Sequence, residues 1–179
     1  MADSGTTGWL WLSFALMTVV SWGLYGVFLH TGQVGMSDPA MGRYKAFLFV
    51  GIAYFVTAVL APLAILLIKG AAWTLPMKGV TWSLLAGIVG AIGAFCVLLA
   101  FGAKGSPTVV MSIIFAGAPI VNAIVALSLH PPAGGLRAIP APFFIGILLA
   151  AVGGCMVTLF KPAPTPHAPP SAAEAIAEP

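Results

Sequence analysis

Two long apolar runs joined by a very short connection constrain the fold of this chain more than any other feature. The runs are Trp82–Ala103 and Val109–Leu129, and only Lys104–Thr108 lies between them. The Gly-Ser-Pro sequence of the connection is typical of a turn, and Pro107 suits the first turn of a helix, where its missing N–H costs no hydrogen bond. Each run is long enough to cross the ~30 Å hydrocarbon core of a bilayer as a helix. We therefore predict a hairpin of two membrane-spanning helices.

The composition excludes a water-soluble domain. Of 179 residues, 60% are hydrophobic and 6% are charged, whereas about 25% of residues are charged in an average soluble domain. Every charged residue lies at the edge of an apolar run or outside it. A charge at the centre of a bilayer costs at least about 2.5 kcal/mol, which explains this placement. The cations are Arg43, Lys45, Lys69, Lys78, Lys104, Arg137 and Lys161, and the acids are Asp3, Asp38, Glu174 and Glu178.

The apolar runs predict an all-α polytopic membrane protein, a bundle of five transmembrane helices surrounded by the lipid bilayer. The spans are expected at about 9–29, 45–68, 80–103, 107–129 and 140–160, which together form one transmembrane domain over 9–160. Residues 1–8 form a short N-terminal segment without the basic region of a signal peptide. The Pro/Ala-rich tail, 161–179, is predicted to be disordered because it cannot bury a core.

Helix-breaking residues predict how the first two spans begin and end. The connection His30–Tyr44 is expected to be a loop, since it contains several glycines. Within it, Asp38 and Pro39 are expected to cap a short helical turn. Pro62 lies inside the second span, where proline would kink the helix or leave a carbonyl unpaired.

No motif in the sequence predicts catalysis, a metal or a cofactor. His30, His130 and His167 are far apart, and no acid, base and nucleophile are arranged for chemistry, so we expect no enzyme and no metal site. The cations are scattered singly, which argues against nucleic-acid binding. No carboxylate lies within a span, which argues against proton-coupled antiport of cations through an intramembrane acid.

The polar residues inside the spans are the candidates for lining a substrate path. Each part of the set also has a structural alternative that remains open: the hydroxyls of the first span bond to carbonyls one turn earlier in their own helix, and Asn122 bonds to a neighbouring helix while Pro119 only kinks the fourth span. As a path, the set suits a neutral or weakly polar solute. The candidates are Ser21, Trp22, Tyr25, Arg43, Tyr54, Ser112, Pro119 and Asn122.

Glycines follow one another at short intervals in the third and fifth spans. Small residues let membrane helices approach closely, so Gly87, Gly90 and Gly93 are predicted to pack the third span against its neighbours. Gly146 and Gly153 are predicted to do the same for the fifth. Loop cations number three on one side of the membrane and four on the other, so the positive-inside rule does not choose between a single orientation and dual topology.

Several short motifs resemble one half of an EamA-type member of the drug/metabolite transporter superfamily. They are the Ser-Trp-Gly-Leu-Tyr-Gly of 21–26, Arg43 at the entrance to the second span, the Ala-Phe-Gly-Ala-Lys of 100–104, the Gly-Ser-Pro-Thr of 105–108 and the Ala-Pro-Ile of 118–120. The resemblance covers about residues 9–160.

The resemblance implies a small-solute or metabolite transporter of the bacterial cytoplasmic (inner) membrane that works by alternating access. Family members of this type carry two inverted five-span repeats, and this chain has one, so an antiparallel homodimer or a partner half is implied. The glutamate that the family's four-span drug exporters carry in their first helix is absent here. The alternative is a non-transporting membrane scaffold or an accessory subunit of a larger complex.

Overall fold

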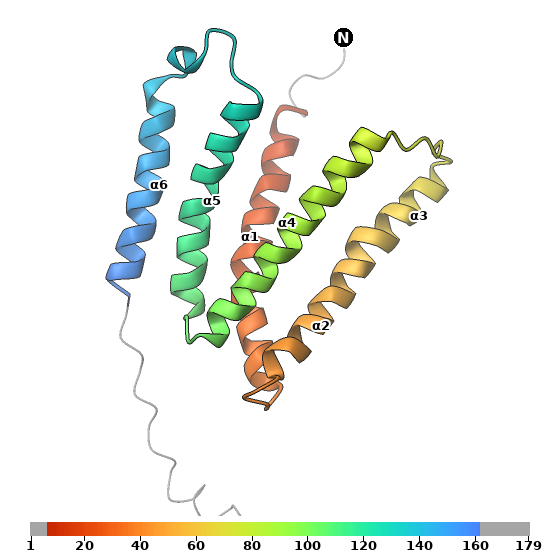
Figure 1. The fold of residues 1–179 in the computed structure, drawn as a ribbon, viewed down its shortest axis with the longest axis vertical. Coiled ribbons are helices and arrows are strands. Elements are labelled where there is room, and N and C mark those ends of the chain that lie inside the picture. Colours follow the sequence, from red (N-terminus) through yellow and green to blue (C-terminus); the bar gives the residue numbers. More distant parts are fainter. Residues whose placement is uncertain (1–6, 162–179) are drawn as a thin grey trace, which may run out of the picture. The chain divides into compact units, whose positions relative to one another are not determined.

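A computed structural model describes residues 7–161, and within that range every regular element is a helix (Figure 1). The expectation of an all-helical chain is confirmed. In chain order the elements are α1 (Thr7–Gly35), α2 (Gly42–Phe55), the π-helical segment η1 (Val56–Leu60), α3 (Ala61–Ile68), α4 (Met77–Gly102), α5 (Pro107–Leu129), the short 3₁₀ helix η2 (Leu136–Ala138) and α6 (Ala141–Leu159). The tail predicted to be disordered lies, except for Lys161, outside the described residues.

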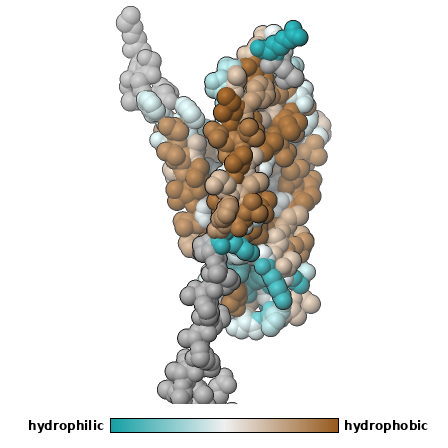
Figure 2. Space-filling view, turned by 90° about the vertical axis from the view of Figure 1, so that its left-hand side faces the viewer, coloured by the Kyte–Doolittle hydropathy of each residue, from teal (hydrophilic) through white to brown (hydrophobic). Residues whose placement is uncertain are grey.

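Five helical segments among the described residues are long and apolar enough to cross a membrane, as predicted. They are Trp9–Gly35, Gly42–Ile68, Met77–Gly102, Pro107–Leu129 and Ala141–Leu159. In the space-filling view, hydrophobic side chains cover the sides of the helices and the hydrophilic residues lie toward their ends (Figure 2). Such a distribution is the one that a bilayer requires.

The chain divides into two compact units, Met1–Ile114 and Phe115–Pro179. The described part of the first unit holds α1 to α4 and the beginning of α5, and that of the second holds the rest of α5 and α6. Each unit is considered by itself below.

The first span is longer than predicted, and the prediction of a loop over His30–Tyr44 is wrong at both ends. Helix α1 continues to Gly35 and α2 begins at Gly42, so that only a short turn separates them. A glycine costs a helix about 1 kcal/mol relative to alanine. That cost is smaller than the cost of leaving backbone groups unpaired in an apolar environment.

Asp38 organises the turn between α1 and α2. Its Oδ1 accepts hydrogen bonds from the N–H groups of Ala40 at 3.1 Å and Met41 at 2.9 Å, as the capping prediction requires. Its Oδ2 pairs with Lys45 Nζ at 2.6 Å. The hydrogen bonds from Lys45 and from the Met41 N–H hold the pKa of the Asp38 carboxyl below its ordinary value.

Pro62 changes the local helix type instead of ending the second span. A proline ring collides with the carbonyl four residues earlier, here that of Ala58. The chain widens ahead of it into the π turn Val56–Leu60, in which the Ala61 N–H donates to the Val56 carbonyl, five residues back. Hydrogen bonding thus continues past the proline, and α2, η1 and α3 form one membrane-length helix.

The core of the first unit lies where the C-terminal half of α4 meets α1 and the start of α5. Leu98 is fully buried, and the other buried members of this core are Leu29, Val97, Phe101 and Met111. Gly26 of α1 allows the close approach, since any Cβ there would collide with the Met111 side chain. The packing holds the faces of α1 and α4 together.

Helix α4 ends as the short connection predicted, in a tight reversal into α5. Lys104 adopts a positive φ of 68°, and the Gly105 N–H donates to the Ala100 carbonyl at 2.9 Å while the Lys104 N–H donates to that of Phe101 at 3.0 Å. This pair of bonds is a Schellman motif, which satisfies carbonyls that a helix end leaves free. Pro107 then opens α5.

Candidate functional site

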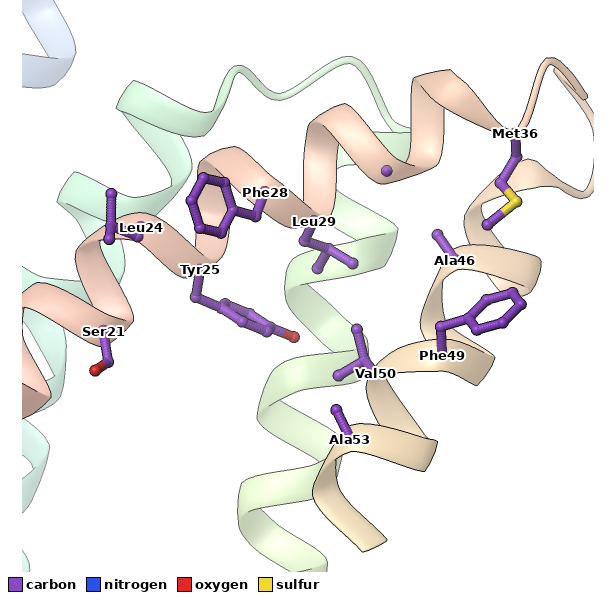
Figure 3. A pocket seen from close by; sticks show the side chains of 11 residues that line it. Ser21, Leu24, Tyr25, Phe28, Leu29, Met36, Ala46, Phe49, Val50 and Ala53 are labelled. Atoms are coloured by element: carbon purple, nitrogen blue, oxygen red, sulfur yellow. The ribbon is translucent and has the colours of Figure 1, made fainter. Parts of the chain in front are cut away.

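An apolar groove lies between α1 and α2, and two of the residues in its wall, Ser21 and Tyr25, are polar (Figure 3). Its volume is about 610 Å³. Most lining side chains are aliphatic or aromatic, and none carries a charge. The lining residues are Ser21, Leu24, Tyr25, Phe28, Leu29, Gly32, Met36, Ala46, Phe49, Val50 and Ala53.

Helix periodicity places these residues on facing sides of the two helices. On α1, the aromatic side chains of Tyr25 and Phe28 are three residues apart; on α2, Ala46, Val50 and Ala53 follow at steps of four and three. Residues three and four apart share one face of a helix. The small side chains of α2 leave open the space that the longer side chains of α1 border.

Tyr25 is the polar group of the groove whose hydrogen-bonding capacity is unused. Its ring packs on Trp22 with centroids 5.6 Å apart, and in Figure 3 its hydroxyl points from α1 toward Val50 of α2. The hydroxyl oxygen is enclosed and has no hydrogen-bond partner. The Tyr54 phenol is close enough to interact with it, but the two hydroxyls do not meet the geometry of a hydrogen bond.

Ser21, the other polar side chain of the groove, has already used its donor. Its hydroxyl donates to the Met17 carbonyl at 2.8 Å, one turn earlier in α1. Ser112 behaves in the same way in α5, donating to the Thr108 carbonyl at 2.7 Å. The structural alternative for the hydroxyls of the first span, bonding within their own helix, therefore describes Ser21, and it extends to Ser112.

Arg43 lies at the start of α2 and reaches the end of α4. Its guanidinium fills the space beside Gly102, where a Cβ would collide with it, and it lies over the Tyr44 ring at 5.1 Å. A cation at a helix C-terminus is favoured by the helix dipole. The Arg43 Nε atom is nevertheless enclosed without a hydrogen-bond partner, as is the Oε1 atom of Gln33.

The remaining candidates do not join the groove. Tyr54 is 41% exposed and stands outside its lining. Pro119 and Asn122 belong to the second unit and are exposed on α5. Of the candidate residues, Ser21 and Tyr25 thus lie in the lining of the groove, and the others lie outside it.

The glycines of α4 that are predicted to pack against neighbouring helices have open space beside them among the described residues. No neighbouring atom comes within 4 Å of a Cβ built at Gly87, Gly90 or Gly93, and the same holds for Gly146 and Gly153 in α6. Helix α4 packs through its C-terminal half instead, where Ala94 is buried with the core residues. In that half of α4 the contacts with other helices are made by the side chains of Val97, Leu98 and Phe101, which fill the space between the helices.

Sequence reasoning missed the apolar part of the groove and Gln33. Apolar residues in a membrane helix give no signal that separates a lipid-facing side from a groove. The regular recurrence of small residues on α2, at Ala46 and Ala53, was the available hint. For Gln33, the hint was its spacing of three residues from His30, which places the two side chains on one face of the helix. The His30 ring packs edge-on against Phe101, with ring centroids 5.6 Å apart.

The fold and the groove together define an integral membrane protein with an apolar groove between two membrane-length helices. Among residues 7–161, no three His, Cys, Asp or Glu side chains gather as metal ligands. Comparison of the chain with protein-family models, with curated proteins and with solved structures finds no match. The functional argument accordingly depends on the residues themselves.

Proposed function

We propose that this chain is half of a small-solute transporter of the EamA-like type, which works as a homodimer or with a partner half in the bacterial cytoplasmic membrane. The observation that carries the proposal is the groove beside Tyr25, an uncharged cavity between membrane-length helices whose wall includes a tyrosine with an enclosed, unpaired hydroxyl. A solute path needs both properties: space, and hydrogen-bonding groups that the fold itself does not consume.

Unpaired polar atoms in an apolar environment are costly. Leaving a buried donor or acceptor unsatisfied costs about 1–3 kcal/mol. Three such side chains occur in the first unit, Tyr25, Gln33 and Arg43. Polar groups kept in membrane helices at such a cost commonly mark solute or ion pathways.

The surface around the α4 glycines, which the described residues of the first unit leave open, supports a partner. The α4 glycines have open space above them, and glycine faces are where membrane helices approach each other most closely. A second copy, parallel or antiparallel, could pack on this face. One five-helix unit with a groove at its side then becomes half of a two-part path.

A scaffold or accessory subunit is the second candidate. The hydroxyls of Ser21 and Ser112 are consumed within their own helices, and no carboxylate lies in a span to couple transport to protons. Both observations suit a chain that only packs against other membrane proteins.

Flux through liposomes separates the two functions. The purified protein is reconstituted, and uptake of a panel of neutral and charged metabolites is compared with protein-free liposomes. Ala53→Phe fills the groove and should abolish the flux, whereas Ala61→Phe, an exposed site outside the groove on the same span, should leave it unchanged. Equal flux in both variants would contradict the groove as a path.

Oligomeric state is tested on the same preparations by crosslinking and native mass measurement in mild detergent. A dimer is expected. A strictly monomeric protein that still carries flux would contradict the two-part path. Asn122→Leu adds a test in the second unit: the transporter hypothesis expects reduced flux with the folded protein retained, and the scaffold hypothesis expects at most weaker assembly.

A further inference from the structure

The groove between α1 and α2 has the chemistry of a site for one particular kind of molecule. Nine of its lining residues have no polar side-chain atom, and Ser21 has committed its proton to the Met17 carbonyl. Tyr25 is left as the single free donor in an otherwise apolar wall. An ion would find no countercharge there, and a sugar would leave most of its hydroxyls unpaired.

The groove is elongated along the helices. On α1 its lining runs from Ser21 to Met36, which at 1.5 Å per residue is roughly 22 Å. The part between Tyr25 and Met36 accounts for about 16 Å of this length. Both walls belong to membrane-length helices, so the groove lies within the thickness of the bilayer, where apolar molecules dissolve.

The depth of Tyr25 excludes an ordinary phospholipid as its partner. Tyr25 lies four residues from Ser21, the middle residue of α1 (Thr7–Gly35), hence about 6 Å from the centre of the span. The hydrocarbon half-thickness is about 15 Å, so the ester carbonyls of the surrounding lipids stay near the interface. An acceptor that reaches the Tyr25 phenol must be carried into the core by another molecule.

We infer that the solute is a neutral, largely apolar molecule with one hydroxyl or carbonyl oxygen, which enters the α1–α2 groove laterally from the bilayer and accepts a hydrogen bond from Tyr25. This inference names the substrate class of the proposed transporter and rests on that function. Because the hydroxyl is enclosed in the empty protein, the phenol rotates toward the groove on binding, a side-chain change common in complexes.

Trp22 provides the readout, because its ring packs on Tyr25. In a background where Trp9, Trp11, Trp73 and Trp82 are phenylalanine, bromine near the groove quenches only Trp22. Three probes with one chain length are compared in liposomes: 2-bromohexadecan-1-ol, 1-bromohexadecane without oxygen, and ionised 2-bromohexadecanoic acid. The alcohol should reach half-quenching at a membrane mole fraction about fivefold lower than the bromoalkane, the effect of one net hydrogen bond.

Matched variants assign this preference to a single atom. Tyr25→Phe should remove the advantage of the alcohol over the bromoalkane, and Ser21→Ala should keep it, since that hydroxyl is already engaged. Ala53→Phe should weaken the advantage by filling the groove, which gives a second test independent of Tyr25.

Three results would overturn the inference. Equal quenching by alcohol and bromoalkane would mean that acyl chains merely fill the groove. A preference that survives Tyr25→Phe would place the donor elsewhere, and stronger quenching by the carboxylate would contradict the neutral class. Alcohol binding without flux refutes transport but leaves the ligand class, whereas flux of charged solutes without alcohol binding refutes the ligand class but leaves transport.

Discussion

Removing the Tyr25 hydroxyl should make the empty protein more stable. The hydroxyl is enclosed and has no hydrogen-bond partner, so Tyr25→Phe deletes an unsatisfied polar atom while keeping the ring that packs on Trp22. The variant therefore gains stability and loses a binding group. Such opposition between stability and activity is expected at sites that are held ready for a ligand.

The size of the gain follows from the environment of the oxygen. An unsatisfied buried hydroxyl costs about 1–3 kcal/mol. Hydrogen bonds between membrane helices average only ~0.6 kcal/mol, because polar groups also find partners in the unfolded state within the membrane. We expect a gain near the lower limit, about 1 kcal/mol, which changes the unfolding equilibrium constant roughly fivefold.

Unfolding in mixed micelles of increasing SDS content, followed by circular dichroism, measures this free energy. Tyr54→Phe is the control: Tyr54 is 41% exposed, and its change should stay within about 0.5 kcal/mol. The double variant should be additive, giving a coupling energy near zero. If Tyr25→Phe destabilises the protein and the cycle shows coupling, the two phenols are hydrogen-bonded and the reasoning is refuted.

Three further changes test the packing and the turn by the same unfolding measurement. Leu98→Ala, at a fully buried site, should reduce the free energy of unfolding by about 2–3 kcal/mol, near the lower end of the range for water-soluble proteins because lipid is itself apolar. Leu99→Ala is the control, since Leu99 is 38% exposed and its loss should cost much less. Equal losses would contradict the core assignment. Gly26→Leu should cost about 1–3 kcal/mol by colliding with Met111, and Met111→Ala in the same chain should recover part of the loss; no recovery would contradict that contact. Asp38 has a lowered pKa in the folded protein, so its stabilising effect is present above its unfolded pKa of about 3.9 and is lost as the pH falls through the lower folded value. Asp38→Asn should therefore reduce stability at pH 7, and its difference from the parent should vanish in strong acid; a difference independent of pH would contradict the ionic role.

The five helices could be predicted from the sequence because bilayer thickness imposes one length on every span. The turn Lys104–Thr108 was equally predictable, since its residues act locally. The extent of α1 was not predictable in this way. Gly32 and Gly35 would favour a helix end in water, but in an apolar environment unpaired backbone groups cost more than glycine does, and the helix continues. The response to Pro62 was uncertain for a related reason: a π turn and a kink relieve the same collision.

The candidate site was only partly predictable because sequence reports polarity, and the groove depends on shape. Ser21 and Tyr25 were identified as polar residues on one helix. Which of them keeps a free donor depends on rotamers: the Ser21 hydroxyl reaches back to Met17, whereas the Tyr25 hydroxyl extends too far from its own helix to do so. The space itself comes from Ala46 and Ala53, whose role no composition argument reveals.

The unpaired hydroxyl of Tyr25 and the groove beside it have a common physical explanation. A phenol on a lipid-facing surface could rotate toward the interface, and one in a tightly packed core would be excluded or paired by selection for stability. Tyr25 is enclosed next to a cavity, so its cost persists in the empty protein and is relieved when an acceptor enters. Part of the binding free energy of such a molecule thus comes from the polar group that the fold leaves unpaired, and a purely apolar chain of the same length gains none of it. Selectivity for one oxygen in an apolar body is the physical consequence.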